Sequence, residues 1–220
     1  VLPQSRRGRA DRCGADPNGR MRINTYLAPL LAALALSACG PVKMPDFAAM
    51  LAGMDMPAMR WDARPEAAQW THATLVAVAA HDDVLASRVP ADIAAWCPNY
   101  KNANMMERRS FWAGVLSAVA KYESSFNPNA SGGGGRYIGL LQISPRSASH
   151  HGCSATSAKA LKDGVANLQC GVEIMANAVG SDGVVAGKGN RGVGRDWMPF
   201  RKAKSRNEMA AWTSKQSYCQ

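Results

Sequence analysis

Glu123 is the residue of this sequence best placed to do chemistry. It ends an apolar, helix-like run, and a Gly-rich segment and then Gln142 follow it. Counting back from Glu123 by helical steps gives Val119, Leu116 and Trp112, so the carboxylate lies on the apolar stripe that faces the core. Burial disfavours the charged form of a carboxylate, so we expect Glu123 to hold its proton. A protonated acid beside a flexible loop is suited to cleaving a glycosidic bond.

The segment after Glu123 supplies groups that suit a sugar ligand. Pro128 forces the chain out of the helix, and the four glycines of 132–135 let backbone approach a bulky ligand closely. Ser131, Tyr137 and Gln142 offer hydroxyl and amide groups for sugar hydroxyls and N-acetyl groups. The segment is therefore a candidate glycan-binding loop.

The elements that must position these residues are mainly helical. Helices are expected over 66–80, 90–96, 105–124, 144–151, 157–179 (with a break at Gly164) and 206–212. Residues 180–195 hold six glycines and indicate a long loop. Continuous strand patterns are absent, which predicts a predominantly α domain with at most a small hairpin at the Gly-rich segment. Trp112 is expected in the core, and His150 and His151 at the surface.

The combination of motifs resembles the soluble lytic transglycosylase (SLT) family of lysozyme-like enzymes. That family has a Glu-Ser pair ending a helix, then Asn-Pro, a small-residue loop and Gly-Leu-Met-Gln-Ile. The matching residues here are Glu123-Ser124, Asn127-Pro128 and Gly139-Leu140-Leu141-Gln142-Ile143, with Leu141 in place of Met. Asn167-Leu168 followed by Gly171 is similar to the family's Asn-Ile helix motif. The resemblance covers roughly 107–180 and implies a lysozyme-like α+β fold with a single helical catalytic domain.

One family motif has no clear counterpart. The later Ala-Tyr-Asn-Ala-Gly motif of the family carries a Tyr that contacts the catalytic Glu, whereas residues 186–197 contain no Tyr. Tyr137, Asp196 and Trp197 are the candidates for orienting Glu123 in its place.

The resemblance implies a peptidoglycan lytic transglycosylase with Glu123 as the single catalytic acid and base. It would cleave the β-1,4 bond between N-acetylmuramic acid and N-acetylglucosamine, leave a 1,6-anhydromuramoyl end, and need no metal or other cofactor. No Asp or Glu lies between Glu123 and Asp163, which suits a site with one carboxylate. The expected substrate-binding residues are Ser124, Ser131, Tyr137, Gly139, Leu140, Leu141, Gln142, Asn167 and Trp197. The alternatives are a hydrolase resembling goose-type lysozyme and an inactive cell-wall-binding lipoprotein.

The N-terminal region is typical of an exported lipoprotein. Residues 1–20 indicate an extension upstream of the true start, and 21–38 have the basic start and short apolar stretch of a signal peptide. The Leu-Ser-Ala-Cys sequence that ends at Cys39 resembles a lipobox, which implies lipidation of Cys39; a plain secretory signal with a chance Cys is the alternative. Gly40 after this Cys favours, by resemblance to enterobacterial sorting rules, the periplasmic face of the outer membrane.

Two further segments follow the predicted leader. Residues 39–65, with four prolines and five methionines, are expected to form a tether between the lipid and the domain, and 66–220 to form the catalytic domain. Soft-metal binding by the methionines is a minor alternative.

The charge of the chain favours an anionic partner in the cell envelope. The formal net charge is +10, and residues 1–38 hold six Arg and two Asp, so 20 basic and 14 acidic residues remain after cleavage. Much of the excess lies near the C-terminus, in Lys188, Arg191, Arg195, Arg201, Lys202, Lys204 and Arg206. These residues form either a solvated basic face or a surface that attracts an anionic polymer. An exported lipoprotein does not meet nucleic acid, so the carboxylates of peptidoglycan fit better; a role with secretion or cell-wall machinery stays open.

Four of the six cysteines are expected to form two disulfides. Cys13 and Cys39 lie in the leader and at its end, which leaves an even set in an oxidising compartment. Three pairings are possible, and we favour Cys153–Cys170 and Cys97–Cys219. A zinc site is the rival, but no cysteines have the short spacing that zinc sites prefer.

Overall fold

The computed structural model describes residue 51 and residues 54–220. The predicted leader and Cys39 lie outside the described residues, as do residues 40–50, 52 and 53 of the predicted tether. The α-helices are α2 (Ala67–Ala79), α3 (Met105–Ser124), α4 (Pro145–His150), α5 (Gly164–Asp182), α6 (Met198–Arg201) and α7 (Ala203–Thr213). Short 3-10 helices are η1 (Ile93–Ala95), η2 (Ala160–Lys162), η3 (Gly192–Arg195) and η4 (Ser217–Cys219), and the strands are β1 (Ser131–Gly132) and β2 (Tyr137–Ile138). Among the described helices, none has the length and apolar character that a membrane crossing requires.

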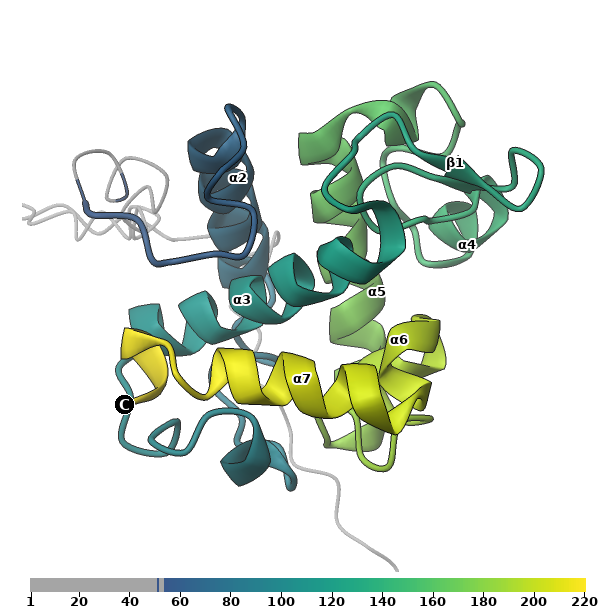
Figure 1. Ribbon diagram of the computed structural model, residues 1–220. Helices are drawn as coiled ribbons and strands as arrows, with labels where there is room; N and C mark the ends of the chain where they lie inside the picture. The colour runs from purple at the N-terminus through teal and green to yellow at the C-terminus, as the bar shows by residue number, and fades with distance from the viewer. Residues whose placement is uncertain (1–50, 52–53) are drawn as a thin grey trace, which may run out of the picture. The chain divides into compact units, whose positions relative to one another are not determined.

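Helix α3 is the central element of the domain and has the bounds that the sequence predicted. It begins at a capping box, in which the Asn104 side chain accepts from the Glu107 amide at 3.0 Å and the Glu107 carboxylate accepts from the Asn104 amide at 2.7 Å. Residues 110–120 are all buried, because α3 contacts α2, α5 and α7 (Figure 1). The mainly helical fold is therefore organised around the helix that ends at Glu123.

Helix α5 begins later and ends later than expected. Residues 157–163 form a turn and η2, and the Asp163 side chain caps α5 by accepting from the Ala166 amide at 2.9 Å. Gly183, with φ 66°, ends the helix in the left-handed conformation that glycine adopts readily. Gly171 faces Leu141 so closely that an added Cβ would lie 2.1 Å from the Leu141 Cδ1 atom. The close approach explains why α5 carries a glycine opposite the loop that follows the hairpin.

The Gly-rich segment forms the small hairpin expected at that point. Strands β1 and β2 pair antiparallel, and the tip turns through Gly133, Gly134 and Gly135, which all have positive φ. A further bridge joins Ile138 to Ile143 and closes the loop between them.

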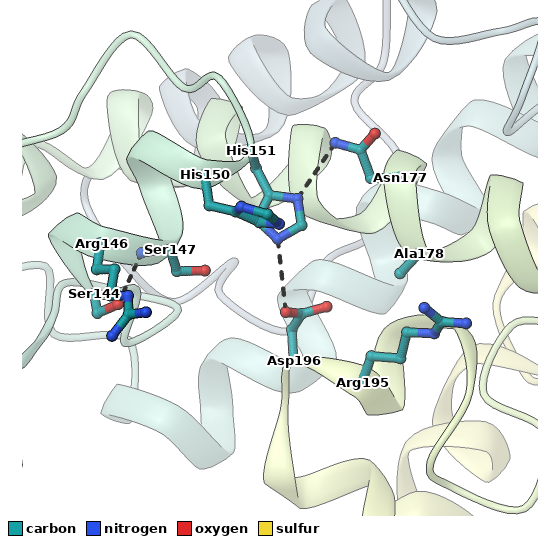
Figure 2. Close-up of a pocket in the computed structure, with 9 residues that line it drawn as sticks. All are labelled: Ser144, Arg146, Ser147, His150, His151, Asn177, Ala178, Arg195 and Asp196. Atoms are coloured by element: carbon teal, nitrogen blue, oxygen red, sulfur yellow. Dashed lines mark hydrogen bonds and ion pairs between the residues drawn. The ribbon is translucent and has the colours of Figure 1, made fainter.

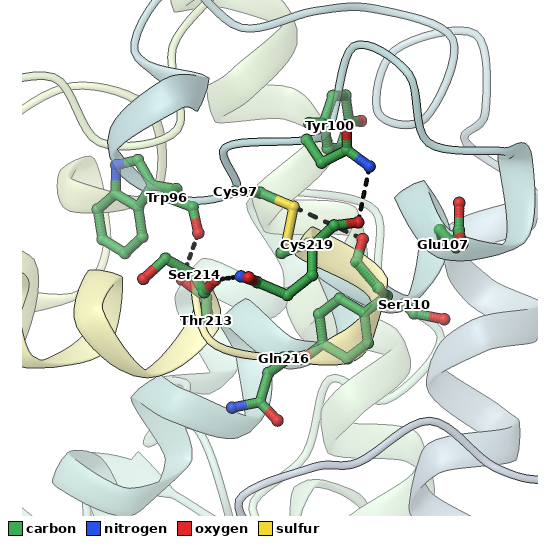
Figure 3. Close-up of a disulfide and its surroundings, with 12 residues drawn as sticks. Trp96, Cys97, Tyr100, Glu107, Ser110, Thr213, Ser214, Gln216 and Cys219 are labelled. Carbon is green, nitrogen blue, oxygen red and sulfur yellow. Dashed lines mark hydrogen bonds between the residues drawn. A yellow bond between two sulfur atoms is a disulfide. The ribbon is translucent and has the colours of Figure 1, made fainter.

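The C-terminal segment forms α6 and α7, which extend further than the single helix expected over 206–212. Both favoured disulfides are present: Cys97–Cys219 and Cys153–Cys170. Around Cys97–Cys219 the Thr213 hydroxyl donates to the Trp96 carbonyl at 2.8 Å (Figure 3). The bridge therefore ties the end of the chain to the segment that precedes α3.

The end of the expected tether is part of the folded domain, which corrects the predicted boundary at residue 66. The Trp61 side chain is fully buried, donates to the Thr71 hydroxyl at 2.9 Å and packs edge-on against Trp70. The Arg60 guanidinium binds the Glu208 carboxylate with two hydrogen bonds of 2.7 and 2.5 Å. The proline-rich composition of this segment indicated a linker. Composition does not show that Trp61 has its packing and hydrogen-bond partners in α2.

Candidate active site

Glu123 lies where the helical spacing predicted, at the end of a buried stripe. Trp112, Leu116 and Val119 are fully buried, and Glu123 itself is partly exposed. Burial raises the pKa of the Glu123 carboxyl to about 7. Within the described residues no hydrogen-bond donor or cation pairs with this carboxyl. Near neutral pH it is therefore present in both its acid and its base forms.

The backbone around Glu123 is strained. Among the described residues, Ser125 (φ 50°), Phe126 (φ 63°) and Gln142 (φ 49°) are the non-glycine residues with positive φ. Two of them follow Glu123 within three positions, and the third lies in the loop after the hairpin. Such conformations cost about 1–3 kcal/mol each and cluster at functional sites. Their distribution supports a site at the end of α3.

A cleft of about 510 Å³ opens beside Glu123. Its lining residues come from the end of α3 and from α6 and α7: Tyr122, Glu123, Met198, Pro199, Lys202, Lys204 and Ser205. The residues after 197 were not predicted as part of the site. The basic cluster near the C-terminus was the available signal, but sequence alone did not place it next to Glu123.

The loop 139–143 is held by side chains that point away from solvent. The Asn167 amide oxygen accepts from the Leu141 amide at 2.9 Å, and its nitrogen donates to the carbonyls of Ile138 and Leu161 at 3.0 and 2.9 Å. The Trp197 indole donates to the Leu141 carbonyl at 2.9 Å. The Ser124 hydroxyl lies 2.8 Å from the carbonyl of Leu140, which joins the end of α3 to this loop.

Apart from Ser124, whose hydroxyl binds the Leu140 carbonyl, the predicted substrate-binding residues fall into two groups. The side chains of Leu140, Leu141, Asn167 and Trp197 are buried, and Gly139 sits where a Cβ would lie 2.3 Å from the Leu161 carbonyl oxygen. For these residues the structure indicates support of the loop, not a side-chain contact with a ligand.

Three polar residues of the predicted set stay accessible. Ser131 and Tyr137 are exposed on the hairpin, Tyr137 at 43%. Gln142 is half-buried, donates to the Gly139 carbonyl at 2.9 Å and lies against Gly132, where a Cβ would meet its amide oxygen at 2.5 Å. They remain the candidates for sugar contacts.

None of the three candidates for orienting Glu123 bonds to it in the described part of the chain. Tyr137 is exposed on the hairpin, Trp197 binds the Leu141 carbonyl, and Asp196 faces His151 at 3.9 Å. The Tyr motif of the family would lie within residues 186–197, and the start of that segment is held by Asp92. The Asp92 carboxylate accepts from the amides of Val185, Ala186 and Gly187 at 2.6, 3.0 and 2.7 Å.

A second cleft of about 590 Å³ lies between α4, α5 and η3 (Figure 2). His151 was expected at the surface, but its side chain is only 16% exposed, because it packs against Asp196 and lies 3.4 Å from the Asn177 amide. Burial raises the pKa of Asp196, and the nearby His151 and Arg195 oppose that rise. His150 is exposed, as expected.

Comparisons with known proteins identify the same region. Residues 101–210 match the family model described as Transglycosylase SLT domain. Three solved structures of Bd0314 DslA are similar to the chain, and each comparison covers 76% of this chain and 100% of the solved one. Two are glutamate-to-glutamine mutants, with 30% identity at a TM-score of 0.68 and 28% at 0.66; the third, wild-type form 2, has 29% identity at 0.66. No curated protein sequence matches the chain significantly.

Proposed function

The chain belongs to the transglycosylase SLT domain family, and from this we propose that it is a peptidoglycan lytic transglycosylase with Glu123 as its catalytic acid and base. The family match and the likeness to DslA support a lytic-transglycosylase-type function. The proposal adds the bond that is cleaved, the product and the catalytic residue.

The observation that carries the proposal is the state of the Glu123 carboxyl. It lines a cleft, has no partner within the described residues, and has a pKa raised by burial to about 7. A general acid works best when its pKa lies near the pH of the reaction, because a proton is then both available and easily transferred. An ordinary glutamate, with a pKa near 4.5, would be almost fully ionised at neutral pH.

One carboxyl would serve both steps of the reaction. Glu123 would protonate the glycosidic oxygen while the bond from C1 of the muramoyl unit to that oxygen breaks. The carbonyl oxygen of the substrate's 2-acetamido group would stabilise the positive charge at C1. Glu123, now ionised, would accept the proton of the muramoyl 6-hydroxyl, whose oxygen bonds to C1 and closes the 1,6-anhydro ring. The carboxyl then holds its proton again, ready for the next cycle.

The surroundings of Glu123 support a mechanism with one carboxylate. Among the described residues that line its cleft, Glu123 is the sole acid. Glu208 of the adjoining α7 binds Arg60, Tyr122 and Lys121, and the hydrogen bond from Arg60 is the main cause that lowers its pKa to about 2. A carboxylate held in this way is already paired with a cation, which makes it a poor nucleophile or base.

Digestion of purified sacculi tests the proposal. Wild type is expected to release muropeptides with 1,6-anhydromuramoyl ends, and Glu123→Gln to release none above background while still binding sacculi. Products with reducing ends would instead identify a hydrolase. If wild type and Glu123→Gln both bind sacculi and neither solubilises them, the chain is a binding protein and the proposal fails.

We also propose that the protein is anchored by a lipid on Cys39 at the periplasmic face of the outer membrane. The support is the signal-like segment 21–38 and the lipobox-like residues before Cys39. Metabolic labelling with a fatty acid is expected to mark wild type but not Cys39→Ser, and membrane fractionation should place wild type in the outer membrane. Labelling of both variants would reject Cys39 as the acceptor.

A further inference from the structure

The cations between residues 191 and 206 fall into two groups. The four arginines of this segment all have partners. Arg191 and Arg195 bind Asp182. Arg201 binds the carbonyls of Gly194 and Arg195, and Arg206 binds the Phe200 carbonyl. The side-chain ammonium groups of Lys202 and Lys204, by contrast, have no hydrogen bond or ion pair with any described residue. The arginines are therefore used in holding the fold, and the two lysines are not.

Both unpaired lysines line the cleft that contains Glu123. Lys202 lies at the junction of α6 and α7, and Lys204 lies in the first turn of α7; both are exposed. They do not lower the pKa of Glu123, whose rise has burial as its sole cause. Because both side chains are exposed and line the cleft, their charges are available to a ligand there.

The rest of the cleft wall is apolar enough to contact an aliphatic chain. Met198 is 55% exposed and Tyr122 is 40% exposed, and Pro199 lies next to Met198. A ligand that suits this surface has carboxylates a short distance from alkyl groups. In peptide-bearing glycan the lactyl carboxyl of each muramoyl unit is in an amide bond and has no charge, so the carboxylates are those of the stem peptide.

We propose that Lys202 and Lys204 bind carboxylates of the stem peptide next to the bond that is cleaved, so that the enzyme prefers peptide-bearing glycan strands to peptide-free strands. The proposal rests on the proposed function, because it places the muramoyl unit beside Glu123. Two exposed ion pairs would contribute a preference of roughly 3- to 30-fold. The preference would shrink as salt is added, because exposed charges are screened.

The test compares strands that carry stem peptides with strands that carry neither the peptide nor its carboxylates. An amidase removes the peptides from one half of a soluble strand preparation, and the lactyl carboxylates that this hydrolysis frees are then converted to methylamides, so that the muramoyl units stay neutral. The quantity measured is the ratio of kcat/KM on the first substrate to that on the second. Lys202→Ala/Lys204→Ala is expected to lower this ratio about tenfold, and Lys202→Arg/Lys204→Arg to restore most of it. Lys159→Ala/Lys162→Ala, which removes two exposed lysines outside the cleft, should keep the wild-type ratio.

A ratio that stays at the wild-type value in Lys202→Ala/Lys204→Ala would overturn the proposal, even if activity on both substrates falls. A second measurement separates this failure from failure of the proposed function. Binding of both strand preparations is measured in the Glu123→Gln background by fluorescence anisotropy. If wild type cleaves neither substrate, the proposed function fails. The binding measurement still tests the inference in that case, and a loss of preferential binding when both lysines are replaced would support it. Equal binding of the two preparations by Glu123→Gln would reject it.

Discussion

The raised pKa of Glu123 predicts a pH-dependent gain in stability when the carboxyl is removed. The change is Glu123→Gln, which keeps the size of the side chain and removes the titration. In the folded protein the pKa is about 7, against an ordinary value of 4.5. Between these pH values the folded state holds a proton that the unfolded state has lost, so the free energy of unfolding of wild type falls as pH rises. At about 1.4 kcal/mol per pH unit, the cost of the ionised carboxylate reaches about 3 kcal/mol above pH 7.

The assay is urea-induced unfolding of wild type and Glu123→Gln at several pH values from 4 to 8.5, with both disulfides intact. The two proteins should have nearly equal free energies of unfolding at pH 4. The variant should become more stable as pH rises from 4.5 to 7, and keep an advantage of about 3 kcal/mol above that. Groups common to both proteins cancel in the difference. A difference that does not change with pH would refute the claim that burial raises this pKa.

Glu208→Gln is a control of opposite sign. The hydrogen bond from Arg60 is the main cause that holds the pKa of Glu208 at about 2, and the side chain is 39% exposed. Its ionised form therefore stabilises the folded state above pH 4.5, and this stability is lost as pH falls from 4.5 toward 2. After allowance for solvent screening, the substitution should cost about 1 kcal/mol at pH 7 and little near pH 2.

Three further predictions concern the residues that support the site. Asn167→Ala leaves the Leu141 amide and the Leu161 carbonyl unpaired and removes one of the two hydrogen bonds to the Ile138 carbonyl. It should lower the free energy of unfolding by about 3 kcal/mol or more, measured in urea; a cost under 1 kcal/mol would contradict its bridging role. Trp197→Phe removes the hydrogen bond to the Leu141 carbonyl and should cost about 1–3 kcal/mol and lower the rate of sacculus digestion; full activity would show that this bond does not position the loop. Cys97→Ser/Cys219→Ser opens a closure of 122 residues and should cost about 5 kcal/mol by the chain-entropy relation, seen as a fall in the urea midpoint; reduction of wild type, which opens both disulfides, should lower the midpoint at least as far.

Local sequence signals predicted the elements that depend on neighbouring residues. The long apolar run predicted the bounds of α3, and in the structure a capping box at Asn104 forms the start of the helix. The hairpin follows from consecutive glycines, which adopt positive φ without strain. The position of Glu123 on the buried stripe follows from helical periodicity alone. The disulfide pairing was one of three possibilities, and the folded chain contains the favoured one.

Contacts between distant segments were decided only by the tertiary structure. The cleft beside Glu123 is lined by 198–205, more than seventy residues away, and no local pattern pairs the two segments. Asn167 and Trp197 were expected to contact substrate, yet their partners are the backbone of 138–161, which the sequence does not identify. The sequence by itself therefore determined the helices, the hairpin and the acid on the buried stripe, because these depend on period and turn chemistry. The tertiary structure determined how far the acid is desolvated and which cations share its cleft, because both depend on which distant segments pack together.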